Sequence, residues 1–155
     1  MKFIAKSLIF CLGLSIFAFA NDSENLKLEN ECENGNIDSC HELADKFYEI
    51  CTTNENLVAG EKAIKDYDKV CKADKSYGSC WQIAYIYTMF ESCVKKNLEI
   101  AKKYAKISCY DENERQACLL LAITSFEDEK YKKEHFQKAC EHGYEQFCKE
   151  LELLK

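Results

Sequence analysis

Cysteines recur along this chain as couples at a nearly constant interval, and this pattern restricts the fold more than any other feature of the sequence. The first members of the couples are 39, 38 and 31 residues apart, and the second members are 40, 38 and 30 residues apart. The couples are Cys32 with Cys40, Cys71 with Cys80, Cys109 with Cys118, and Cys140 with Cys148. A period of about 30 to 40 residues, long enough for two helices, is typical of α-solenoids.

Apolar residues repeat with the cysteines and indicate two helices in each unit. Three positions after the second cysteine of every couple comes an apolar residue: Leu43, Ile83, Leu121 or Leu151. Before the first cysteine, small or aromatic residues return at helical spacing, as in Ala63-Tyr67-Cys71. The sequence therefore predicts an all-α fold, an α/α solenoid. Its repeats are expected at 38–72, 78–110 and 116–141, with single capping helices at 24–34 and 146–154.

Two of the predicted helices begin with a capping-box pattern. Ser39 to Glu42 and Ser79 to Gln82 both read S-x-x-E/Q. In such a box the serine accepts a hydrogen bond from a free backbone N–H, and the acid or amide reaches back to the serine N–H. We therefore expect Ser39 and Ser79 to be N-caps.

The first twenty residues have the three parts of a secretory signal peptide. Lys2 and Lys6 precede an apolar run over residues 7–17, and residues 18–20 read as an A-x-A cleavage site. The run is shorter than the about 20 residues that a membrane-spanning helix needs. We predict that residues 1–20 are removed together with Cys11. The mature chain, residues 21–155, would then be secreted or periplasmic and have no membrane span.

Ten cysteines remain after this cleavage, an even number that indicates disulfides in an oxidising compartment. Structural zinc sites use cysteine pairs about two to four residues apart, and the chain has no such pair, so we expect no metal site. A turn between antiparallel helices brings the members of each couple close enough to bond. Cys51 and Cys93 are left over and are predicted to bond to each other; the alternative is a pair of free buried thiols.

Charge and composition restrict the partners. The formal net charge is −6, and it becomes −8 when Lys2 and Lys6 leave with the signal peptide. An acidic surface repels phosphate backbones, so we expect no nucleic-acid partner. The chain has no proline and is rich in Glu, Lys, Leu and Ala, which favours helices.

These features together resemble the Sel-1-like repeat proteins, and in particular the Helicobacter cysteine-rich protein family. The likeness rests on the cysteine couples, on Ala63-Tyr67-Cys71 and on the turn Gly143-Tyr144 before Cys148, and it extends over residues 24–154. It implies a secreted or periplasmic solenoid of disulfide-stapled α/α repeats, with penicillin binding and weak β-lactamase activity. Tetratricopeptide arrays are the nearest alternative, but their period of about 34 residues fits the spacing less well.

No catalytic residue can be named from the sequence, and no cofactor is implied. The complete set of serine β-lactamase motifs, S-x-x-K with S-D-N and K-T-G, does not occur. The three histidines, His41, His135 and His142, lie on different predicted elements without the H-E-x-x-H spacing of a zinc hydrolase. We expect all three to be exposed on helices.

The helix expected from residue 79 is apolar nearly all round. Ile83, Ala84 and Tyr87 belong to its predicted core stripe, whereas Trp81 and Tyr85 point another way. The next repeat carries Leu119 and Ile123 at the same offsets. We predict that Trp81, Tyr85, Leu119 and Ile123 form a groove for an extracytoplasmic protein, peptide or cell-wall-like ligand. Two alternatives remain: a β-lactam-like ligand, as the family implies, or burial of these side chains in the core.

Overall fold

The computed structural model describes residues 23–74 and 78–154, and all regular secondary structure within them is helical. The predicted signal peptide and its Cys11 lie outside the described residues. A helix over residues 23–33 is followed by α2 (Ile37–Asn54), α3 (Leu57–Ala73), α4 (Ser79–Met89), α5 (Leu98–Asp111), α6 (Arg115–Ile123), α7 (Lys132–Glu141) and α8 (Glu145–Leu153). The prediction of an all-α fold is confirmed. None of the described helices combines the length and the hydrophobicity that crossing a membrane requires.

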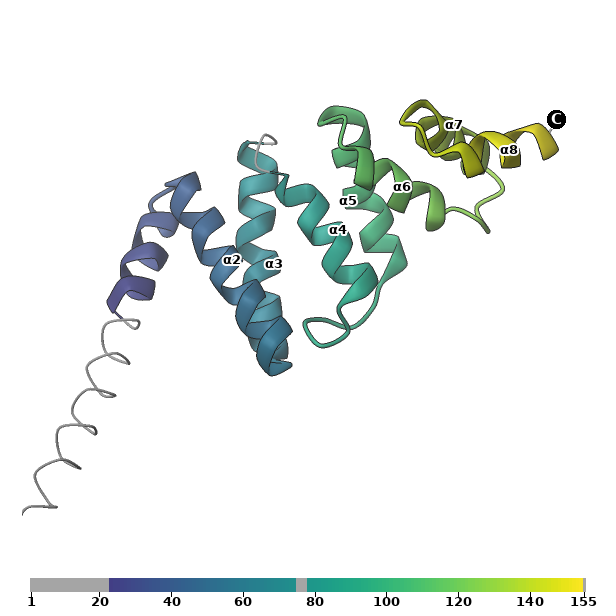
Figure 1. The fold of residues 1–155 in the computed structure, drawn as a ribbon. Coiled ribbons are helices and arrows are strands. Elements are labelled where there is room, and N and C mark those ends of the chain that lie inside the picture. The colour runs from purple at the N-terminus through teal and green to yellow at the C-terminus, as the bar shows by residue number, and fades with distance from the viewer. Residues whose placement is uncertain (1–22, 75–77, 155) are drawn as a thin grey trace, which may run out of the picture.

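The helices follow one another in chain order along an elongated molecule (Figure 1). From α2 to α8 each helix packs against the next, and α4 also contacts α6 directly. The buried side chains form several clusters along this row: the largest is centred on α2, α3 and α4, and others lie among α4, α5 and α6 and among α6, α7 and α8. The arrangement is repeat-like, because each helix obtains its core from its neighbours.

Asparagines, rather than the predicted serines, cap three of the helices. The side-chain oxygens of Asn36, Asn56 and Asn97 each accept a hydrogen bond from the backbone N–H three residues on, at 3.0–3.1 Å. The capping-box prediction at Ser39 is wrong, because α2 begins two residues earlier, at Ile37. Ser39 Oγ instead donates to Glu31 Oε2 at 2.7 Å and so ties α2 to the preceding helix.

The capping-box prediction at Ser79 is wrong as well. α4 begins at Ser79 itself, and its N-cap is Gly78, which has a φ of +66° that glycine adopts at little cost. Within the described part of the chain, Ser79 Oγ is buried without a hydrogen-bond partner. The backbone of Gly78, not a serine side chain, therefore sets the start of α4.

Five disulfides join the ten cysteines of the described residues. Four of them link the end of one helix to the start of the next, with Cα–Cα distances of 4.6–5.0 Å: Cys32–Cys40, Cys71–Cys80, Cys109–Cys118 and Cys140–Cys148. The fifth, Cys51–Cys93, joins α2 to the turn after α4 and spans 42 residues. These are the five pairs that the cysteine spacing predicts. Their number indicates an oxidising, extracytoplasmic environment.

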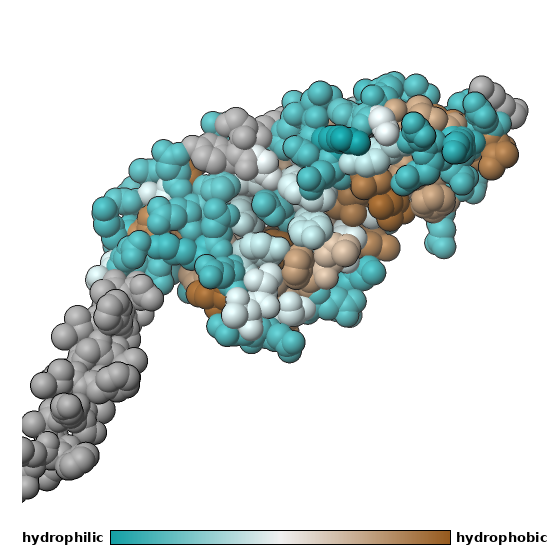
Figure 2. Space-filling view, in the orientation of Figure 1, coloured by the Kyte–Doolittle hydropathy of each residue, from teal (hydrophilic) through white to brown (hydrophobic). Residues whose placement is uncertain are grey.

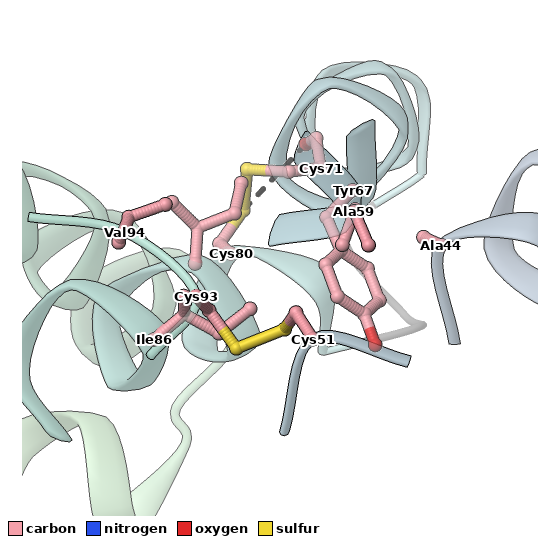
Figure 3. Close-up of a cluster of buried hydrophobic side chains, with 11 residues drawn as sticks. Ala44, Cys51, Ala59, Tyr67, Cys71, Cys80, Ile86, Cys93 and Val94 are labelled. Carbon is pink, nitrogen blue, oxygen red and sulfur yellow. Dashed lines mark hydrogen bonds between the residues drawn. A yellow bond between two sulfur atoms is a disulfide. The ribbon is translucent and has the colours of Figure 1, made fainter. Parts of the chain in front are cut away.

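The Cys51–Cys93 bond lies in the largest cluster of buried side chains, beside the ring of Tyr67 from α3 (Figure 3). Tyr67 is fully buried, and its hydroxyl donates to Asp45 Oδ1 on α2 at 2.6 Å. Gly60 of α3 lies so close to the turn after α4 that a Cβ atom there would be 1.9 Å from the Cys93 carbonyl oxygen. α2, α3 and this turn are therefore held together by a covalent bond and by close backbone contact.

The C-terminal helices are shorter and pack through aromatic rings. Phe126, Phe136 and Phe147 form a mutual group with ring centroids 5.0–6.0 Å apart. Such a group contributes through buried area and through the tilted or edge-to-face geometry that aromatic rings prefer. This group packs α7 against α8 and against the turn that follows α6.

Candidate binding groove

The four side chains that the sequence selects for binding line one open groove. Trp81 and Tyr85 come from α4, and Leu119 and Ile123 come from α6. The groove has a volume of about 520 Å³, and its other lining residues are Tyr48, Gln82, Met89, Gln116 and Leu120. Hydrophobic side chains gather over the α4 and α6 part of the face seen in Figure 2, while much of the surrounding surface is hydrophilic. The alternative of complete burial does not apply to these side chains, since Ile123 is 49% exposed and the other three are partly exposed.

Helical periodicity explains why α4 presents these residues. Ile83, Ala84 and Ile86 face the core and are fully buried. Trp81 and Tyr85 are four residues apart, so they lie one above the other on another face of the helix. Tyr87 of the predicted core stripe packs against the core but is only partly buried, and Ile86, which the stripe did not include, is fully buried.

A chain of aromatic contacts connects α4 to α2 along the groove. The ring of Trp81 stacks on Tyr85 at a centroid distance of 5.1 Å, and Tyr85 meets Phe90 edge-on at 5.3 Å. Phe90 in turn meets Tyr48 of α2 edge-on at 5.6 Å. The sequence did not select Tyr48 for the groove, because the equivalent position of α4 is Thr88 and the one after α6 is Phe126, which does not line the groove. Through these contacts the tryptophan and tyrosine rings lie together as an aromatic wall.

The polar groups of the groove are neutral. The carboxamides of Gln82 and Gln116 and the hydroxyl of Tyr85 have no hydrogen-bond partner within residues 23–74 and 78–154, so they are available to a ligand. Burial raises the pKa of the Tyr48 hydroxyl, and the neighbouring Tyr85 raises it further. Tyr48 therefore stays uncharged at neutral pH. The lining can donate and accept hydrogen bonds without a charge that would favour an ionic ligand.

The chain contains one S-x-x-K tetrad, Ser92 to Lys95, which lies in the turn after α4. In the described structure Ser92 Oγ contacts the disulfide-bonded Cys93 Sγ at 4.0 Å and makes no hydrogen bond to Lys95. A serine nucleophile needs a base that takes its proton. This tetrad does not provide one.

His135 is buried, so the prediction of three exposed histidines is wrong for it. Only 2% of the residue is exposed, and its Nδ1 lies 2.7 Å from Ser125 Oγ, which lies 2.7 Å from the Leu121 carbonyl oxygen. Because a carbonyl only accepts, both bonds are satisfied when Ser125 donates to Leu121 and the imidazole N–H donates to Ser125. The histidine then does not accept the serine proton. This pair is a buried structural contact between α7 and the turn after α6.

The other two histidines and the cysteine beside one of them are the remaining candidates for chemistry. His41 and His142 are partly exposed. Cys40 precedes His41 but is bonded to Cys32, so it is no nucleophile. No group of three or more His, Cys, Asp and Glu side chains in the described ranges is placed to hold a metal ion.

No protein-family model matches the chain, and comparisons with curated proteins and with solved structures gave no match either. The resemblance to Sel-1-like repeat proteins therefore stays a prediction.

Proposed function

We propose that this protein is an extracytoplasmic helical-repeat scaffold that binds a peptide or a segment of another protein in the groove between α4 and α6. One observation carries the proposal: Trp81, Tyr85, Leu119 and Ile123 line a single open groove of about 520 Å³ with uncharged polar groups. Open apolar clefts with a few polar groups are the usual form of a binding site, and tryptophan and tyrosine are frequent anchors in protein recognition.

A Sel-1-like solenoid is part of the proposal, with each disulfide-stapled pair of helices as one repeat. Its support is the recurring cysteine couple and the order of the helices. α2, α4, α6 and α8 all contain the second cysteine of a couple, and the first three of them contribute residues to the groove. Repeat proteins commonly bind partners on the extended surface that equivalent helices form.

Secretion or a periplasmic location is also proposed. It is supported by the signal-peptide pattern of residues 1–20 and by the five disulfides, which persist in oxidising compartments. A partner would then be an extracytoplasmic peptide or protein.

Selection of random linear peptides on the purified, oxidised protein tests the proposal. Peptides recovered by the wild type should bind about thirty-fold more weakly to Trp81→Ala or Tyr85→Ala, because truncating one aromatic anchor commonly costs ~2 kcal/mol or more. Val58→Ala is the matched control: Val58 is 66% exposed on α3 and does not line the groove, so this variant should bind normally. Circular dichroism should be native for all three variants.

Peptides that bind all variants equally well would place recognition elsewhere and refute the proposal. The same preparation tests the weak lactam hydrolysis that the family resemblance implies, with a chromogenic cephalosporin as substrate. Two results together would replace the proposed function by the enzymatic one. The Trp81→Ala variant would still hydrolyse the cephalosporin, and no peptide would bind in a way that depends on the groove.

A further inference from the structure

We infer that the groove takes a polyproline II segment with two apolar side chains three residues apart and a basic side chain at the end that lies over α2. This inference names the ligand class of the proposed function and rests on it. Three properties of the groove support it: the spacing of its helices, its unused hydrogen-bonding groups and the distribution of charge around it.

The spacing expected for two packed helices favours one backbone conformation of the bound segment. Tyr85 and Ile123 both stand five residues after the second cysteine of their couple, and both line the groove. The two helices contact each other, and packed helices lie about 8–10 Å apart. A polyproline II helix rises about 3.1 Å per residue with three residues per turn, so residues i and i+3 share a face about 9.3 Å apart. An extended β-strand repeats a face every about 6.6 Å and matches this spacing less well.

The polar lining suits the same conformation. A polyproline II segment makes no internal hydrogen bonds, so its carbonyl groups remain available to a partner. Gln82 and Gln116 can donate to them through carboxamides that have no partner in the described residues. The aromatic wall of Trp81 and Tyr85 matches the way such segments dock in aromatic-lined grooves.

The charges of α2, α4 and α6 indicate which end of the bound segment should be basic. α4 contains no charged residue and α6 contains Arg115 alone, whereas α2 contains four carboxylates and one lysine. An apolar segment therefore suits α4 and α6, and a cationic end suits α2.

Asp45 is the residue of α2 that we expect to meet the cation. It occupies the offset of Tyr85 and Ile123, and its side chain is 53% exposed. Its Oδ1 accepts from the Tyr67 hydroxyl at 2.6 Å, and its Oδ2 lies 3.3 Å from His41 Nδ1. The carboxylate is thus held on the face of α2 that carries Tyr48, one turn along the helix.

The test uses fluorescein-labelled Arg-Pro-Pro-Leu-Pro-Pro-Leu and its reverse, Leu-Pro-Pro-Leu-Pro-Pro-Arg, since the chain direction is open. The better binder should lose about tenfold in affinity when its arginine is replaced by glutamate. Asp45→Asn keeps an oxygen for the Tyr67 hydroxyl but removes the charge. It should bind the arginine peptide three- to five-fold more weakly, as an exposed ion pair predicts, and should lose most of the preference over glutamate. Replacing the prolines of the peptide by glycine should weaken binding further.

The outcomes separate this inference from the function on which it rests. Library peptides that need Trp81, together with arginine and glutamate peptides of equal affinity, would leave groove binding intact and overturn the inferred charge. Equal affinity of the proline and glycine peptides would overturn the inferred conformation. If no peptide of either kind depends on Trp81, the proposed function itself fails.

Discussion

The two ends of this molecule stabilise the same kind of helical unit in different ways. At the N-terminal end, α2 and α3 have 18 and 17 residues, and the Cys51–Cys93 disulfide ties α2 to the turn after α4. At the C-terminal end, α6, α7 and α8 have 9, 10 and 9 residues. Among the described residues that follow α6, the only disulfide is the short Cys140–Cys148 staple. Phe126, Phe136 and Phe147 and the buried Ser125–His135 pair connect its helices instead.

The difference teaches that the cysteine couple defines the repeating unit but does not determine how neighbouring units are joined. Repeats in a linear array contact only their neighbours, so each junction has its own stability. The N-terminal junction is fixed by a covalent bond, which does not depend on pH. The C-terminal junction depends on packing and on a neutral imidazole, and it should respond to acid.

Removal of the Cys51–Cys93 bond should cause the largest loss of stability that we predict. A disulfide that closes a loop of 42 residues stabilises by about 4 kcal/mol on the chain-entropy model, compared with about 2.5 kcal/mol for a loop of eight. The double variant Cys51→Ser/Cys93→Ser should therefore lose more stability than Cys140→Ser/Cys148→Ser. Urea unfolding of the oxidised proteins, followed by circular dichroism, measures both. Equal losses would contradict the loop-length argument, and no loss on removal of Cys51–Cys93 would mean that the N-terminal junction holds by packing alone.

Gly60→Ala should have the next largest effect and tests the backbone contact in the same junction. Helix propensity alone predicts that alanine stabilises α3 by about 1 kcal/mol. The new Cβ atom, however, would lie 1.9 Å from the Cys93 carbonyl oxygen, so we expect a loss of about 1–3 kcal/mol. A decrease in the unfolding free energy would show that the steric clash outweighs helix propensity, and an increase would show the opposite.

A double-mutant cycle sharpens this second prediction. In the Cys51→Ser/Cys93→Ser background the turn after α4 is free to move, so Gly60→Ala should cost less there than in the wild type. A cost that stays the same in both backgrounds would show that the close approach does not depend on the disulfide.

The features that the sequence predicts well are those that follow from local spacing. Each cysteine couple closes a small loop between consecutive helices, so its pairing is visible in the sequence. Trp81 and Tyr85 are separated by one helical turn, and Leu119 and Ile123 repeat their offsets. Because these rules act within a helix or between equivalent helices, they need no knowledge of the tertiary structure.

The features that the sequence predicts poorly depend on how distant segments meet. The contact of Gly60 with Cys93 and the burial of His135 against Ser125 arise only when separate elements pack. The N-caps failed for another reason. Ser39 and Ser79 match the capping-box pattern. However, α2 begins before Ser39, after its N-cap Asn36, and the backbone conformation of Gly78 sets the start of α4.

The smallest effect that we predict is a loss of stability in mild acid at the C-terminal junction. Burial lowers the pKa of His135, an effect that the nearby Glu134 only partly opposes, so the native ring takes up a proton at a lower pH than a free histidine does. In the unfolded chain the same histidine takes up a proton near pH 6.5. The unfolded state therefore binds more protons as the pH falls below about 6.5, and the unfolding free energy decreases with it. Above that pH the contribution of the neutral ring is fully present.

Urea unfolding between pH 7.5 and pH 5 should show this slope in the wild type and a smaller slope in His135→Leu, which has no proton to bind at that position. His142→Gln is the comparison variant, because it removes a histidine that is partly exposed at the end of the same helix. The slope should change more in His135→Leu than in this variant. Hydrogen exchange locates the effect: amides of α7 should lose protection on acidification before those of α3, whose junction is covalently held. Equal slopes in wild type and His135→Leu, or simultaneous loss of protection in both helices, would remove the distinction between the two ends of the molecule.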